Sequence, residues 1–137
     1  MNGNNTNPIN SSTPFTIKNG SKIDIFFKNI TSLQNFFNSY NDENREDIIS
    51  IDLSNLNSSS FTDLGHLFYS CKSLKYIDFL NFDTPKVTNM QLMFEVCISL
   101  KLLVLSSFKK SQVTQLDAMF SGFKNLLSIY LSNFDTS

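Results

Sequence analysis

The sequence contains few of the residues that build chemical sites. Among its 137 residues are one His, two Cys, four Gly and no Trp. Two cysteines are too few for a disulfide framework, and one His cannot build a histidine-rich metal site. The sequence shows no nucleophile elbow, no glycine-rich phosphate loop and no paired-carboxylate motif. We therefore expect a protein that is not an enzyme, with no catalytic residue, no metal and no cofactor.

Charge and long apolar runs are also scarce. The chain has 11 Lys and Arg against 12 Asp and Glu, a formal net charge of -1. Nucleic acids and anionic membranes require a basic surface, so neither is an expected partner. The densest apolar run, Leu102–Leu105, is far shorter than the roughly 18 residues of a membrane span. Residues 1–14 lack both a basic residue and an apolar run, so no signal peptide is expected and the location stays unknown.

What the chain does contain divides it into three parts. Residues 1–14 are rich in Asn, Ser, Thr and Pro, which predicts a disordered arm. Residues 15–47 carry apolar side chains at steps of three and four, which predicts a helical N-terminal cap. The apolar side chains of that stripe are Ile23, Phe26, Phe27, Ile30, Leu33, Phe36, Phe37 and Tyr40.

The remainder, residues 48–137, repeats with a period of 26 residues. A half repeat at 48–60 precedes repeats at 61–86, 87–112 and 113–137. Apolar residues recur at equivalent positions in the three repeats. The columns are Phe61/Val87/Val113, Leu64/Met90/Leu116, Leu67/Met93/Met119, Phe68/Phe94/Phe120, Leu74/Leu100/Leu126, Ile77/Leu103/Ile129, Phe79/Leu105/Leu131 and Phe82/Phe108/Phe134.

Each repeat changes its apolar period halfway along. Residues 87–97 show helical spacing, whereas the Leu100-x-x-Leu103-x-Leu105 segment alternates as a strand does. One such unit cannot bury its apolar face alone, so the repeats must stack. We therefore predict an α/β solenoid in which each 26-residue repeat contributes a short helix and a short parallel strand.

Four motifs carry a resemblance to a known family. The L-x-x-I-x-L-x-x-F pattern at 126–134, VTNMxxMF at 87–94, MFSG at 119–122 and LSNFDTS at 131–137 resemble the BspA-like leucine-rich-repeat family, the 26-residue repeat of bacterial surface proteins. The resemblance implies a leucine-rich-repeat solenoid without enzymatic activity. It also implies a secreted or cell-surface protein associated with adhesion and protein binding.

One face of the predicted strands is the candidate binding surface. If Ile77 and Phe79 point inward, the residues between them and their equivalents point outward. Apolar and aromatic side chains on a face that should be wet often mark a protein interface. The same pattern fits a face covered by another part of the chain, such as the arm. The candidate residues are Tyr76, Asp78, Leu80, Leu102, Val104, Ser128 and Tyr130.

An alternative function follows from the last repeat. The sequence after residue 113 offers no polar repeat to close the stack, which predicts an open edge with an unpaired strand. On this interpretation the chain is a truncated fragment of a longer repeat array, and it self-associates through its last coil. The first interpretation predicts a protein partner of unknown identity.

Two pairs of residues and the single histidine also carry groups that chemistry could use. Cys71 and Cys97 lie 26 residues apart, so they form either a disulfide or, as we favour, a buried apolar ladder. Asp83 and Asp135 suggest a calcium ladder, but Lys109 in the same column favours Asp side chains that bond their own turns. His66 lies on the predicted helix without a motif partner and is expected to be a half-exposed packing residue.

Overall fold

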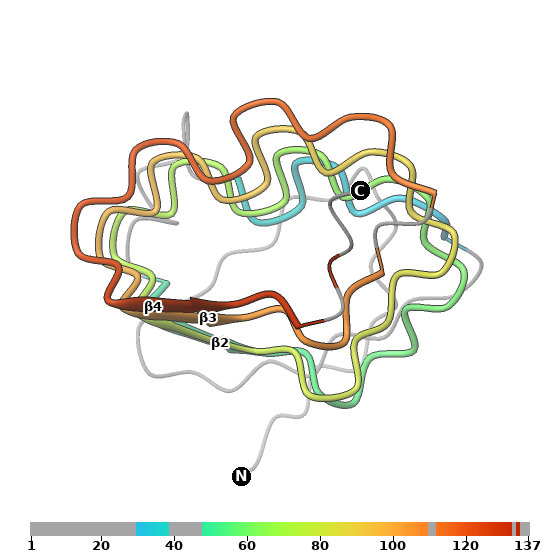
Figure 1. Cartoon of the computed structure of the whole chain (residues 1–137), viewed down its shortest axis with the longest axis horizontal. Helices are drawn as coiled ribbons and strands as arrows, with labels where there is room; N and C mark the ends of the chain where they lie inside the picture. The colour runs from blue at the N-terminus through green and yellow to red at the C-terminus, as the bar shows by residue number, and fades with distance from the viewer. Residues whose placement is uncertain (1–29, 39–47, 110–111, 133, 135–137) are drawn as a thin grey trace, which may run out of the picture.

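The computed structural model describes residues 30–38, 48–109, 112–132 and 134. It contains four three-residue strands: β1 (Ser50–Asp52), β2 (Tyr76–Asp78), β3 (Leu102–Val104) and β4 (Ser128–Tyr130). β1 pairs with β2 and β3 pairs with β4, both parallel, so the strands form two separate two-stranded sheets. Each residue pairs with the residue 26 positions later, and successive repeats stack with the strands on one side and an undulating chain on the other (Figure 1).

No helix forms in the part of the chain that the structure describes. The segment 87–97, whose apolar spacing predicts a helix, is a series of turns instead, and so is the equivalent segment in the other repeats. The prediction of an α/β leucine-rich-repeat solenoid is therefore wrong. What the structure shows is short strands in two small sheets, connected by turns.

The backbone hydrogen bonds explain why the turns replace a helix. In repeat 61–86, every second N–H group on the turn side donates to a carbonyl of the next repeat, at 2.8–2.9 Å. These N–H groups are then unavailable for the bonds to the fourth preceding residue that define a helix. The donor and acceptor pairs are Leu64 to Asn89, His66 to Gln91, Phe68 to Met93, and Ser70 to Glu95.

The intervening residues close four-residue turns. Leu67 donates to the carbonyl of Leu64 at 3.2 Å, and Cys71 donates to that of Phe68 at 3.1 Å. The third residue of each turn has a positive φ, 56° at His66 and 61° at Ser70, as type II turns require. Consecutive four-residue turns place apolar side chains on one side at steps of three and four. The spacing that predicts a helix therefore fits these turns equally well.

The N-terminal cap is not helical where it is described. Residues 30–38 form the same kind of turn, and Leu33 and Phe37 donate at 2.9 Å to the carbonyls of Asp63 and Leu67. The sequence ITSLQNFF at 30–37 aligns with FTDLGHLF at 61–68, an additional half repeat 31 residues earlier that the sequence analysis missed. The rest of the predicted cap and the predicted arm lie outside the described residues.

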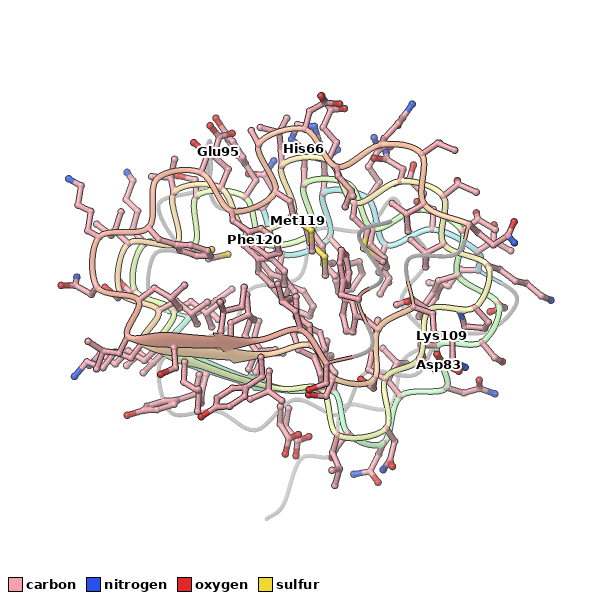
Figure 2. The ribbon with its side chains drawn as sticks, viewed as in Figure 1. His66, Asp83, Glu95, Lys109, Met119 and Phe120 are labelled. Carbon is pink, nitrogen blue, oxygen red and sulfur yellow. The ribbon has the colours of Figure 1, made fainter. Side chains whose placement is uncertain are left out.

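The core fills the space between the strands and the turns (Figure 2). Equivalent phenylalanines stack almost flat along the repeats, with ring centroids 5.4 Å apart for Phe37 and Phe68, and 5.6 Å for Phe68 and Phe94. Phe79 reaches across from the strand side and meets Phe94 edge to face, with centroids 6.2 Å apart. Each repeat therefore buries its rings against its neighbours, as stacked units must.

Candidate protein-binding surface

The structure places the seven predicted face residues together on the outer side of β2, β3, β4 and the turn after β2. We call this surface the strand face. Its large apolar members are exposed: Tyr76 to 56%, Leu80 to 74%, Leu102 to 42%, Val104 to 41% and Tyr130 to 53%. Asp78 and Ser128 are exposed as well. In the β3–β4 register, Leu102 pairs with Ser128 and Val104 pairs with Tyr130, so the candidate residues line up across the strands.

The strand face is split between β2 and β3. At the end of each paired strand, the next N–H group donates to the neighbouring strand: Leu53 to Asp78 and Leu105 to Tyr130, both at 2.9 Å. Phe79 occupies the equivalent position after β2, but its N–H group has no acceptor among the described residues. The residue is only 4% exposed. A buried N–H group without a partner is rare in native proteins, which makes this position notable.

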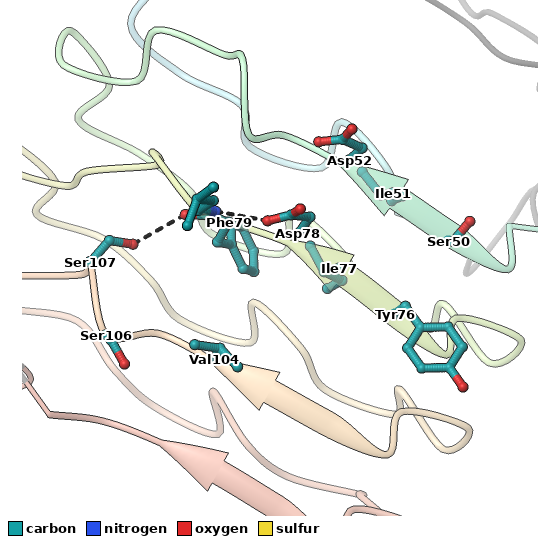
Figure 3. A pocket seen from close by; sticks show the side chains of 11 residues that line it. Ser50, Ile51, Asp52, Tyr76, Ile77, Asp78, Phe79, Val104, Ser106 and Ser107 are labelled. Carbon is teal, nitrogen blue, oxygen red and sulfur yellow. Dashed lines mark hydrogen bonds between the residues drawn. The ribbon is translucent and has the colours of Figure 1, made fainter.

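An open depression of about 540 Å³ lies over the split, and its lining side chains are drawn in Figure 3. Ser107 bridges the split at one end, where its hydroxyl donates to the carbonyl of Phe79 at 3.3 Å. This depression was not predictable from the sequence, because a strict repeat predicts an unbroken ladder. The available signal was Ser107, which stands where the preceding repeat has Asn81. The lining residues are Ser50, Ile51, Asp52, Tyr76, Ile77, Asp78, Phe79, Leu80, Val104, Ser106 and Ser107.

The two cysteines form the buried ladder that we favoured. Both thiols are free and buried, and each donates to a carbonyl of an earlier segment: Cys71 to Phe37 at 3.0 Å and Cys97 to Phe68 at 3.2 Å. Burial, with a smaller contribution from the neighbouring Cys71, raises the pKa of the Cys97 thiol far above its usual range. A thiol in this state is a packing group rather than a nucleophile.

Asp83 bonds its own turn, as expected. Its Oδ1 accepts from the N–H group of Thr84 at 2.8 Å, and its Oδ2 lies 2.9 Å from Nζ of Lys109 (Figure 2). Asp135 lies outside the described residues. Among the residues that are described, no group of three or more His, Cys, Asp or Glu side chains is arranged to hold a metal ion.

His66 is half-buried, but it occupies a turn with positive φ rather than a helix. Its ring meets the ring of Tyr69 at a centroid distance of 5.5 Å and an angle of 61°. These contacts agree with a packing residue, whereas the predicted helical position is wrong.

The last repeat presents a second exposed surface, which we call the end face. Leu127 is 82% exposed and Ile129 is 36% exposed, and several other apolar side chains of the repeat, among them Leu116 and Phe120, are only partly buried. The turn-side N–H groups that would donate to a following repeat have no acceptor among the described residues. These donors belong to Leu116, Ala118, Phe120 and Gly122.

Together these features define a repeat protein built from stacked turns and short parallel strands, with an apolar strand face. Residues 31–137 match a family model described as "Mycoplasma protein of unknown function, DUF285". Because the match covers most of the chain, the protein belongs to this family. The predicted membership of the BspA-like leucine-rich-repeat family is therefore wrong, and the cell-surface and adhesion expectations that depended on it lose their basis.

Comparisons with curated proteins and with solved structures found no match. Over the described ranges, no helix has the length and apolar character needed to cross a membrane.

Proposed function

We propose that the protein is a non-catalytic protein-binding module that holds its partner on the strand face. The observation that carries the proposal is the gathering of five exposed large apolar side chains on neighbouring strands and the turn after β2. Two of the five are tyrosines, and tyrosine is enriched at the centres of protein interfaces. Its ring buries a large apolar area while its hydroxyl stays able to hydrogen-bond.

The scaffold behind this face supports recognition without large rearrangement. Leu103 is 1% exposed and Leu105 is fully buried, so β3 is held from beneath by the core. A surface fixed in this way loses little conformational entropy when a partner binds, which favours affinity. The exposed side chains are therefore presented by backbone that stacking already holds in place.

The test is capture of partners by immobilised full-length chain from an extract of the source cells, with variants run in parallel. The test variant combines Tyr76→Asp with Val104→Asp, which places two negative charges in the strand face. A matched control combines Lys86→Ala with Lys124→Ala, two exposed positions away from this face, and it changes the net charge by the same amount.

We expect the wild-type chain and the control to capture the same proteins and the test variant to lose them. Circular dichroism and urea denaturation of all three chains verify that each is folded. Equal capture by the folded test variant would contradict binding through the strand face.

A second candidate function, self-association through the end face, is favoured by a different observation. In the preceding repeat the equivalent N–H groups donate to the repeat that follows, so the turn side of this face offers donors without matching acceptors among the described residues. Two end faces that met turn side to turn side would oppose donor with donor. The favourable arrangement is head to tail, in which the carbonyls of another copy accept these bonds.

Light scattering across a concentration series tests this candidate, with Ile129→Lys as the variant that charges the end face. Larger species that grow with concentration and disappear in the variant would support self-association. A wild-type chain that stays monomeric throughout would exclude it.

A further inference from the structure

We propose that the partner presents an extended polypeptide segment with a Lys or Arg side chain, and that this segment docks over the split between β2 and β3. The inference rests on the proposed function, since it specifies the chemistry of the partner on the same face. Three properties of the depression support it: its backbone, its charge and its apolar walls.

The backbone at the split offers an unused donor to an extended segment. The N–H group of Phe79, a residue that is 4% exposed, has no acceptor among the described residues, whereas Leu53 and Leu105 donate from the equivalent positions. A carbonyl from a docked segment that runs along the strands would accept this bond, as in other cases of strand addition. In an unbroken sheet this N–H group would donate to the neighbouring strand and would not be available to a partner.

The charge of the depression is negative. Asp78 is exposed and lines the depression, and the described residues that line it include no Lys, Arg or His. Oδ1 of Asp78 accepts from the N–H group of Leu80 at 2.9 Å, which fixes the carboxylate, while Oδ2 has no partner among the described residues (Figure 3). An exposed carboxylate such as that of Asp78 attracts a cationic side chain and repels an acidic one.

The apolar walls of the depression determine which residues can stand next to the basic residue in the partner segment. Tyr76 and Leu80 on one side and Val104 on the other are apolar and exposed. The methylene stem of Lys or Arg packs against such side chains, and a guanidinium also stacks on a tyrosine ring. Neighbouring residues of the segment that contact these walls must themselves be apolar. The expected partner segment therefore combines a basic residue with apolar neighbours.

The probe for this inference is a phage-displayed library of random 12-residue peptides, panned against the immobilised full-length chain. Enriched peptides are then synthesised, and their affinities are measured for the wild type, Asp78→Asn and Asp117→Asn. The last variant is the control. Asp117 is an exposed carboxylate on the turn side, and Asp117→Asn removes the same charge as Asp78→Asn. We expect enrichment of Lys or Arg beside apolar residues. Asp78→Asn should weaken binding about fivefold, and Asp117→Asn should leave it unchanged.

Amide hydrogen exchange supplies an independent readout. The Phe79 amide should slow by tenfold or more when an enriched peptide binds, while the Leu105 amide, already bonded, should change little. Enriched peptides without a basic residue, or peptides that bind Asp78→Asn as well as the wild type, would overturn the inference.

The panning also separates this inference from the proposed function. Peptides that lose binding in the Tyr76→Asp, Val104→Asp variant but ignore Asp78→Asn would leave binding on the strand face intact and reject the cationic segment. Peptides that ignore all of these substitutions would count against both. A library that yields no binding peptide would reject docking of an extended segment at the split.

Discussion

The middle repeat, 87–112, and the last repeat, 113–137, have the same apolar pattern but very different burial. In the middle repeat Phe94 is fully buried and Leu103 is 1% exposed. The equivalent residues of the last repeat are Phe120, which is only partly buried, and Ile129, which is 36% exposed. The difference comes from the neighbours, since one repeat is stacked on both sides and the other on one side among the described residues.

This comparison shows where the stability of the molecule arises. Over its described residues, a repeat in this fold has no helix and only three strand residues, and the backbone hydrogen bonds within it close short turns. The next repeat supplies acceptors for the turn-side N–H groups that do not close turns, and its rings stack on those of the repeat before it. The interface between repeats is therefore the main stabilising element, as in other stacked-repeat proteins.

The largest expected effect is the loss of stability when an equivalent phenylalanine ring is removed from each of the two repeats. Phe94→Ala removes a buried ring that stacks on Phe68 and Phe120, and it should lower the free energy of unfolding by about 3–5 kcal/mol. Phe120→Ala removes a partly exposed ring stacked on one side, and about 1–2 kcal/mol is expected. Urea denaturation followed by circular dichroism measures both. Equal losses would mean that the last repeat is covered in solution.

Amide hydrogen exchange compares the same repeats without a substitution. The amides of Leu92 and Phe94 donate to the last repeat at 2.9 and 3.2 Å, whereas those of Ala118 and Phe120 have no acceptor among the described residues. The first pair should exchange about 100-fold more slowly, because opening must break the contact between repeats. Protection of the Ala118 and Phe120 amides that grows with protein concentration would instead indicate pairing of end faces.

A smaller effect depends on pH and uses a position at which the two repeats differ chemically. Cys97 in the middle repeat is replaced by Phe123 in the last. Burial raises the pKa of the Cys97 thiol in the folded state above its unfolded value of about 8.5. The folded state thus keeps a proton that the unfolded state loses above that pH. The stabilising contribution is complete below about pH 8.5 and falls by about 1.4 kcal/mol per unit above it.

Urea denaturation of the wild type and of Cys97→Ala at a series of pH values from 7 to 10 measures this contribution. The difference in stability between the two chains should be constant up to about pH 8 and should then shift in favour of the variant. A difference that stays constant to pH 10 would show that the thiol of Cys97 is not held protonated by burial.

The repeat was predictable from the sequence, whereas the backbone conformation within it was not. The period of 26 residues gave the strand register, because Ile51 pairs with Ile77 and Leu103 with Ile129. The helices were wrong because steps of three and four residues fit four-residue turns as well as a helix. A glycine would have indicated a turn position with positive φ. Of the three equivalent positions Ser70, Val96 and Gly122, which all have a positive φ, only the last is a glycine.

The strand face was predictable from the alternation around each strand, because alternation fixes which side chains point outward. The split in that face was not. It depends on whether the N–H group of Phe79 reaches β3, and no pattern of apolar residues encodes such a displacement. The contribution of Ser107 was visible only as a departure from the repeat.

The smallest effect is expected at the one charged contact between repeats that the described residues show. Lys109 and Asp83 form an ion pair whose side chains are 55% and 42% exposed, so solvent screens the attraction. Lys109→Ala should change the free energy of unfolding by about 0–0.5 kcal/mol, and salt should reduce even that.

A buried hydrogen-bonded contact lies beside this ion pair: the hydroxyl of Thr84 donates to the carbonyl of Lys109 at 3.1 Å and accepts from its N–H group at 2.8 Å. Thr84→Val leaves both backbone groups unpaired and should cost about 1–3 kcal/mol. If Lys109→Ala proved the more damaging substitution in urea denaturation, charge rather than buried hydrogen bonding would hold these repeats together at this edge.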